Sequence, residues 1–269
     1  MDINPIRKLE GFTNPKQIPH TYWVAPLTAL IVVFGWELTV RLMHLPTIIL
    51  PSPIQVLERF GELLVSGSLM KSTSATFIEI VLGLLAGSIT ATLLGYFIAK
   101  SHLFERLVSP FLVASQAVPV VAIAPLLFIW FDTGMFTKVL ICALIVFFPV
   151  LINTVVGIRA VPQSLHELMR SLRATRWQIL RHLEIPAALP VFLGGLRIGA
   201  TLSVIGAVVG ESVSLDSGLG LMITQGRGGY DTPQVFVAVF TLVGLALSLY
   251  GIVLLLEKKF LAWQDINHS

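Results

Sequence analysis

One polar stretch, residues 162–190, interrupts an otherwise apolar sequence and carries most of its clustered charge. Its positive charges are Arg170, Arg173, Arg176 and Arg181. In its first half, Leu165, Leu168, Met169 and Leu172 follow the i, i+3, i+4, i+7 spacing of one apolar helix face. The pattern predicts a helix with one apolar and one cationic side, which is typical of a binding surface rather than of a catalytic site. A solvated basic loop that only fixes the orientation of the chain in a membrane is the alternative.

Two helix-start signals divide this stretch. In each, a hydroxyl residue is followed three positions later by Glu or Gln, which is the spacing of a capping box. The two pairs are Ser164 with Glu167 and Thr175 with Gln178. We therefore predict two short helices joined by a bend at 173–175, with Pro162 before the first helix and Pro186 ending the second.

A second group of polar residues lies inside long apolar runs. We take Gln116, Trp130, Asn153, Ser203 and Glu211 as candidates for the lining of a transport path. Three prolines in the run around Gln116 predict a broken helix, which a membrane tolerates where neighbours or a cavity satisfy the freed carbonyls. A simple packing kink is the alternative. For Asn153 we expect a hydrogen bond across helices, and we expect Glu79 to be interfacial.

Several kinds of chemistry have no motif in the sequence. It contains no G-x-x-x-x-G-K-[ST], no H-E-x-x-H and no G-x-S-x-G. Cys142 stands alone in an apolar run, so we expect it to pack rather than to bind metal. We predict that the chain is not an enzyme and binds no cofactor of its own.

The composition predicts an integral membrane protein. Of its 269 residues, 55% are hydrophobic and only 12% are charged, and the mean hydropathy is +0.85. Soluble proteins carry about 25% charged residues. Runs of roughly 20 apolar residues are long enough to cross a bilayer. We expect six spans at about 22–43, 75–99, 107–131, 139–158, 189–213 and 235–256. In the first span, Glu37 and Arg41 share a face and are expected to pair.

The distribution of Lys and Arg predicts the orientation. With both termini in the cytoplasm, the inner segments hold twelve Lys and Arg residues and the outer segments hold four, among them Lys138. We expect a cytoplasmic segment 1–21, a six-helix domain 22–257 with its large cytoplasmic loop at 159–188, and a cytoplasmic tail 258–269. Outside, we expect an amphipathic helix at 54–65 and a glycine-rich loop at 214–233 with a short helix at 219–224. The small net charge of +3 does not indicate a nucleic-acid partner.

The polar stretch resembles the cytoplasmic loop of binding-protein-dependent ABC importer permeases, in particular the nitrate, sulfonate and taurine branch. Arg173 stands where that family has a glycine, and Leu168 and Met169 stand where it has small residues. The matching positions in the loop are Glu167, 171–174, 176–178 and 185–190. Further matches are 50–53, 124–126, 130–131, 148–149, 195–197 and 217–220, so the resemblance covers nearly the whole chain.

This resemblance implies a type I importer permease of the bacterial plasma membrane. Its two short loop helices would dock in a groove of a separate ABC ATPase, present in two copies, which uses the ATP. The residues expected to couple the two proteins are Glu167, Leu168, Met169, Arg170, Ser171, Leu172, Arg173, Ala174 and Trp177. Two copies of the chain, surrounded by lipid, would enclose the path. An extracytoplasmic binding protein would deliver the substrate.

The resemblance leaves several substrates open. They are a sulfonate or taurine, a nitrate-like anion, or a vitamin or pyrimidine precursor. Two other functions also stay open: an ion-coupled secondary transporter, which needs ionisable residues in the middle of the membrane, and a membrane scaffold.

Overall fold

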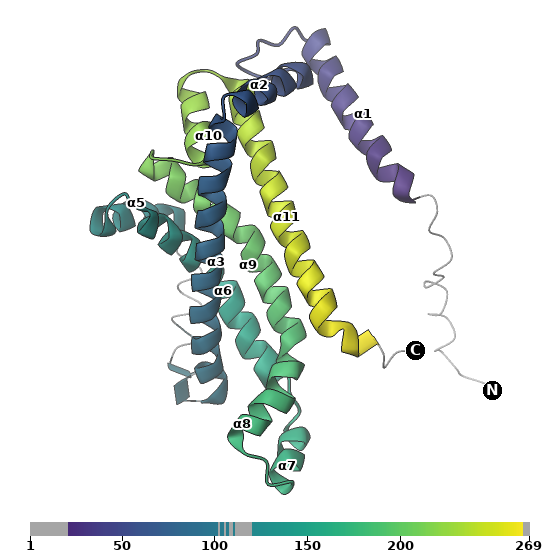
Figure 1. The fold of residues 1–269 in the computed structure, drawn as a ribbon, viewed down its shortest axis with the longest axis vertical. Coiled ribbons are helices and arrows are strands. Elements are labelled where there is room, and N and C mark those ends of the chain that lie inside the picture. The colour runs from purple at the N-terminus through teal and green to yellow at the C-terminus, as the bar shows by residue number, and fades with distance from the viewer. Residues whose placement is uncertain (1–20, 102, 105, 108–109, 111–119, 266–269) are drawn as a thin grey trace, which may run out of the picture.

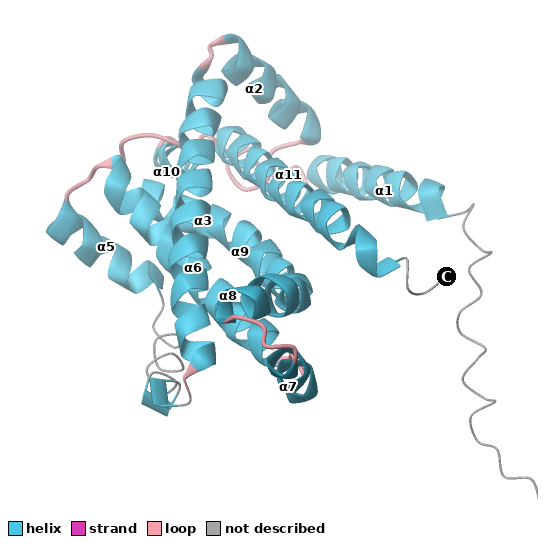
Figure 2. Cartoon of the chain, turned by 60° about the horizontal axis from the view of Figure 1, so that its bottom comes forward, coloured by secondary structure: helices cyan, strands magenta, loops and turns pink. Residues whose placement is uncertain are grey.

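A computed structural model describes residues 21–101, 103–104, 106–107, 110 and 120–265, and in these residues it contains helices and no strands (Figures 1 and 2). The first two elements of the chain are α1 (Thr21–Leu42) and α2 (Pro53–Val65). The long bundle helices are α3 (Ser68–Lys100), α6 (Met135–Arg159), α9 (Ile185–Ser214) and α11 (Thr232–Asp265). The shorter elements are α5 (Val120–Phe131), α7 (Gln163–Ser171), α8 (Arg176–Ile179), the π-helical turn η3 (Leu180–Glu184) and α10 (Leu219–Gly228).

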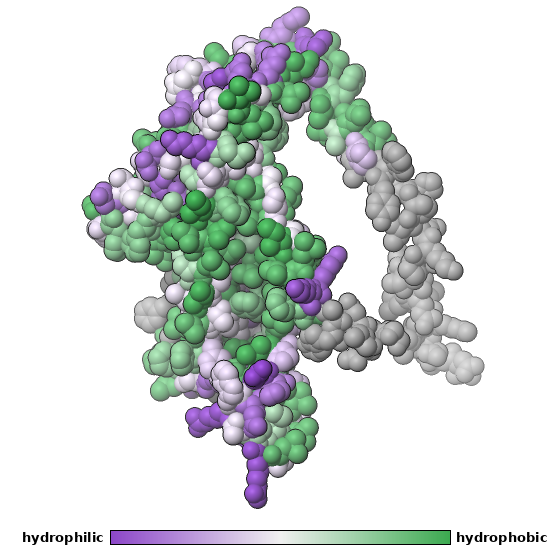
Figure 3. All heavy atoms as spheres, in the orientation of Figure 1, coloured by the Kyte–Doolittle hydropathy of each residue, from purple (hydrophilic) through white to green (hydrophobic). Residues whose placement is uncertain are grey.

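Four helices of the described chain are long and apolar enough to cross a membrane. They are α3, α6, the continuous helix Arg176–Ser214 and α11 over Thr232–Leu261. They correspond to the second, fourth, fifth and sixth expected spans. The first expected span is a helix of 22 residues, α1. Of the third, α5 forms the last part, while Gln116 and its neighbours lie outside the described residues. The band of apolar side chains in Figure 3 is what lipid would cover.

Helix α6 lies between α3 and α9 because glycines on both neighbours allow close approach. A Cβ added at Gly83 of α3 would lie 2.2 Å from Cβ of Cys142 on α6. A Cβ added at Gly206 of α9 would lie 2.8 Å from Cα of the same cysteine. In lipid, where burial of apolar surface drives little association, such close packing of small residues holds helices together. Cys142 is buried and packs between the two glycines, as expected from the sequence.

Helix α1 lies at the edge of the molecule, next to α2 and the start of α11 (Figure 1). Trp36 stacks on Phe236 of α11 with 5.4 Å between ring centroids, and its indole N–H donates to the carbonyl oxygen of Pro51 at 3.0 Å. The expected pair within α1 is confirmed, since Nε of Arg41 lies 2.5 Å from a Glu37 oxygen. The expected amphipathic helix is also confirmed: α2 starts at a capping box of Ser52 and Gln55 and buries Val56 and Leu63, while its place outside the membrane stays a prediction.

Candidate functional site

The first of the two loop helices starts differently from the prediction. Pro162 is the N-cap residue of α7 and has extended backbone, so the helix begins at Gln163 and Ser164 already lies inside its first turn. The predicted capping box of Ser164 and Glu167 is therefore wrong. The Glu167 carboxylate instead accepts a hydrogen bond from Nε2 of Gln163 at 3.1 Å.

The bend between the helices is confirmed, and its geometry is defined by the backbone. The N–H of Ala174 donates to the carbonyl of Met169 at 3.0 Å, and that of Arg173 donates to the carbonyl of Arg170 at 2.9 Å. These are the two bonds of a Schellman motif, which requires a left-handed residue at its centre. Arg173 takes that conformation with φ 56°. The second capping box, Thr175 with Gln178, then starts α8 as predicted.

Replacing Arg173 by glycine is expected to leave the loop intact and to raise its stability slightly. A left-handed conformation costs an L-residue about 1 kcal/mol, which glycine avoids. Thermal unfolding of the purified chain, monitored by the loss of monodisperse protein, should show an unchanged or higher midpoint. Arg170→Gly is the matched control, because it places glycine inside α7 and should cost about 1 kcal/mol. If Arg173→Gly lowers the midpoint as much as Arg170→Gly does, glycine is not favoured at this left-handed position and the prediction is wrong.

The loop presents large apolar side chains to the surroundings. Leu168 is 55% exposed, Leu172 70% and Trp177 66%. Figure 3 shows apolar side chains next to hydrophilic ones at this end of the molecule. Of the other residues expected to couple, Glu167, Arg170, Ser171 and Arg173 are exposed, and Met169 and Ala174 are half-buried.

The second loop helix does not end at Pro186, so this prediction is wrong. Helix α8 continues through η3 into α9 as one helix, Arg176–Ser214. In the π-helical turn, the N–H of Ile185 bonds to the carbonyl of Leu180. This wider turn just before Pro186 gives room for the proline ring, which would otherwise disturb the preceding turn. The exposed loop is thereby connected directly to a membrane span.

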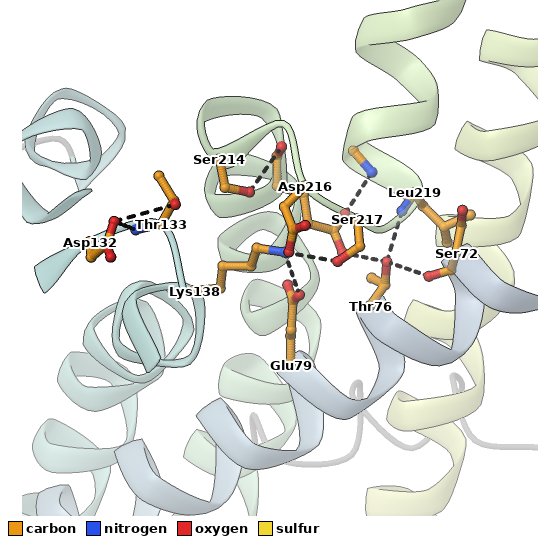
Figure 4. A network of polar contacts seen from close by, with 12 residues as sticks. Ser72, Thr76, Glu79, Asp132, Thr133, Lys138, Ser214, Asp216, Ser217 and Leu219 are labelled. Carbon is orange, nitrogen blue, oxygen red and sulfur yellow. Dashed lines mark hydrogen bonds and ion pairs between the residues drawn. The ribbon is translucent and has the colours of Figure 1, made fainter. Parts of the chain in front are cut away.

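At the opposite end of the bundle, a buried polar network joins α3, α6, α9 and the segment before α10 (Figure 4). Nζ of Lys138 lies 3.1 Å from a Glu79 oxygen, and the Lys138 side chain is only 1% exposed. The same Nζ donates to the Ser217 hydroxyl at 3.1 Å and lies 3.6 Å from Asp216. Both predictions for this pair are wrong: Glu79 is fully buried rather than interfacial, and Lys138 belongs to α6 rather than to the preceding loop. Their helices extend further outward than expected, which brings both side chains inside.

Glu211 belongs to the same network. One of its oxygens accepts a hydrogen bond from the Thr76 hydroxyl at 2.5 Å, and the other accepts from the N–H of Gly220 at 2.6 Å. The Thr76 oxygen also accepts from the N–H of Leu219 at 2.9 Å. Gly220 leaves room for this, because a Cβ there would lie 2.9 Å from Cβ of Glu211. Both carboxylate oxygens of Glu211 are thus bound by the chain itself.

The other path candidates do not come together around a shared site. Trp130 is exposed on α5, and Ser203 is buried on α9 with its hydroxyl donating to the carbonyl of Ala200. Asn153 donates to the carbonyl of Pro149 in its own helix at 2.8 Å, so the expected hydrogen bond across helices is wrong. The Asn153 side chain contacts α9 instead by packing on Gly195. Gln116 lies outside the described residues. A path role for these residues stays a prediction.

Comparison with known proteins gives consistent matches. The family model described as "Binding-protein-dependent transport system inner membrane component" matches residues 80–261. The riboflavin transport system permease protein RibX of Chloroflexus aurantiacus is 46% identical over 239 residues, covering 89% of both chains. The formylaminopyrimidine transport permease protein ThiX of Halalkalibacterium halodurans is 36% identical, covering 87% of this chain and 93% of the relative. An inward-facing structure of the MetNI methionine ABC transporter is similar in fold, with a TM-score of 0.63 at 19% identity over 73% of this chain and 97% of that one.

Proposed function

The chain belongs to the family of binding-protein-dependent transport system inner membrane components, and from this premise we propose that two copies of it enclose the path of an importer. The chain is a multi-pass permease subunit of an ABC importer with the type I fold. Its family implies an ATPase and a substrate-binding protein as partners. We further propose that each pair of permeases binds two ATPase subunits, and that these subunits use the ATP. The complex would lie in a bacterial plasma membrane.

The observation that carries this function is the exposed apolar face of α7. Leu168 and Leu172 are exposed and lie outside the helices that are long and apolar enough to cross a membrane, and Trp177 is exposed at the start of one of those helices. Exposed apolar side chains grouped on one face indicate an interaction site, and tryptophan and arginine are enriched at protein interfaces. We assign this face to a cleft of the ATPase, and Glu167, Arg170 and Arg173 to its charged rim.

For the substrate, we propose a vitamin or a pyrimidine precursor of a vitamin. Support comes from the names of RibX and ThiX, which refer to riboflavin and formylaminopyrimidine. Other relatives are named for sulfonates and taurine at lower identity, 33% and 29%. We take riboflavin as the first substrate to test.

Uptake into vesicles tests the proposal. The chain is reconstituted with its ATPase, and the binding protein and radiolabelled riboflavin are added outside, with taurine in a parallel sample. We expect riboflavin uptake that requires ATP inside the vesicles, on the side of the ATPase, and that continues when an uncoupler is added. A secondary transporter would instead lose uptake with the ion gradient, even with ATP present. Uptake of taurine but not riboflavin would leave the importer in place and reject the proposed substrate.

A further inference from the structure

A second buried carboxylate lies at the inner end of the bundle, where α7 meets the spans. Glu184 is the last residue of η3, and its side chain is only 1% exposed. Its Oε1 contacts Nε2 of His166 at 3.0 Å and also forms an ion pair with Nζ of Lys100. Its Oε2 is buried and has no hydrogen-bond partner among the described residues.

The three residues come from three separate elements. His166 lies on the exposed loop helix α7, Lys100 is the last residue of α3, and Glu184 lies within the continuous helix that becomes α9. One carboxylate oxygen therefore connects the loop helix to two membrane spans. Because Lys100 and Glu184 are 84 residues apart, this connection depends on the tertiary fold alone.

Packing between α3 and α9 is incomplete next to this contact. A cavity of about 430 Å³ lies between them beside α6, and its lining includes Leu93, Tyr96, Leu189, Phe192 and Glu184. Side chains that line a cavity lose their dispersion contacts on that side, so the direct contact between α3 and α9 is weak here and the two helices are joined at this level mainly through α6. The ion pair of Lys100 and Glu184 bridges the two helices at this level. Lys100 is held in place by Tyr96 as well, whose ring centroid is 5.5 Å from Nζ.

This ion pair is weak evidence for stability, since the Glu184 carboxylate is buried at a cost in desolvation while the Lys100 ammonium stays partly exposed to solvent. The contacts of Glu184 explain its position better, because they join α7 and the end of α3 to the start of α9. Glu184 also lies in a π-helical turn, a feature that often marks functional positions in helices.

We propose that Glu184 is the positioning residue that transfers movement of α7 to α3 and α9 during the nucleotide cycle. The inference rests on the proposed function, because the ATPase is what moves α7. When α7 shifts, His166 displaces the Glu184 carboxylate, and Lys100 makes the end of α3 follow. The three elements then move as one body, as rocking of rigid helices requires.

Distances between spin labels on two copies of the chain test this inference without a substrate. In a Cys142→Ala background, one sample carries a label at Ser164→Cys on α7, and another at Leu94→Cys on α3. Both are assembled with the ATPase in lipid nanodiscs, with and without ATP and vanadate. In the otherwise unmodified chain we expect both inter-copy distances to change. With Glu184→Gln we expect the α7 distance still to change and the change at α3 to become clearly smaller, because only the packing through α6 then joins α3 to the moving helices.

Matched variants keep the test informative. Glu58→Gln makes the same chemical change at an exposed site on α2 and should leave both changes intact. Lys100→Gln should act like Glu184→Gln, whereas Lys100→Arg keeps the positive charge and should restore the change at α3. His166→Ala should weaken it, and His182→Ala, whose ring contacts only the Gln178 carbonyl among the contacts of the described residues, should not.

The outcomes separate the two proposals. If the α3 distance changes in Glu184→Gln and Lys100→Gln as much as in the unmodified chain, Glu184 does not transfer the movement and the inference is wrong. If the α7 distance stays constant in the unmodified chain, the ATPase does not move this helix, and the proposed function fails together with the inference.

Discussion

Replacing Lys138 by methionine should destabilise the outer end of the bundle more than any other single change considered for this chain. The variant keeps the length of the side chain but leaves the buried Glu79 carboxylate without the ammonium group with which it pairs. Removing one partner of a buried ion pair typically costs about 3–5 kcal/mol. We expect a clear fall in the midpoint of thermal unfolding in detergent, followed as the fraction of monodisperse protein after heating.

A second substitution distinguishes loss of charge balance from loss of packing. Glu79→Gln combined with Lys138→Met removes both charges, and this neutral combination should recover much of the stability, because the two residues interact directly. Lys71→Met is the control for the loss of a lysine, since Lys71 is exposed on α3. If the double variant is as unstable as Lys138→Met alone, the Lys138 side chain contributes by its packing and its contacts with Ser217 and Asp216, and not by pairing with Glu79.

Local signals in the sequence predicted local structure well. The capping box of Thr175 and Gln178 lies within one turn, so its chemistry is complete in the sequence and the structure confirms it. The failed box of Ser164 and Glu167 shows the limit of the same rule: Pro162 took the N-cap position, and one turn can have only one start. The predicted helix end at Pro186 was wrong because a π-helical turn accommodates the proline, and the sequence before Pro186 did not indicate such a turn.

The polar networks could not be predicted in the same way. Glu79 and Lys138 are 59 residues apart, and they meet only because glycines bring α3 and α6 into close contact. From the sequence, Glu79 was expected at the membrane interface and Lys138 outside the spans, so a pair between them was not predicted. Glu184 was hidden for the same reason, because its contacts come from α3 and α7. Pairing across helices depends on their register and rotation, which hydropathy does not define.

The two buried networks have complementary roles in the proposed cycle. The outer network connects α3, α6, α9 and α10 by ion pairs and hydrogen bonds, so these helices form a rigid unit at that end. At the inner end, the unit is held less tightly, since a cavity lies beside the contact of Lys100 and Glu184. Force applied at α7 would therefore rotate a stiff body, in agreement with rigid-body movement during alternating access.

Aspartate at Leu168 and at Leu172 should abolish binding of the ATPase while the spans stay folded. Burying one leucine in a cleft contributes about 1.5–3 kcal/mol, and a buried unpaired carboxylate adds a further penalty. The double variant should therefore weaken association by at least about 100-fold. Co-purification of the ATPase and its affinity for the detergent-solubilised chain measure this.

The same two positions define the control. Both leucines are exposed in the structure, so aspartate there should leave the thermal unfolding of the isolated chain nearly unchanged. Val65→Asp places the same charge on an exposed apolar residue of α2, at the opposite end of the chain's spans, and should keep full ATPase binding. If the Leu168 and Leu172 variant binds the ATPase as well as Val65→Asp does, α7 is not the docking surface. The exposed apolar face would then need a different partner, and the movement assigned to Glu184 would have no source.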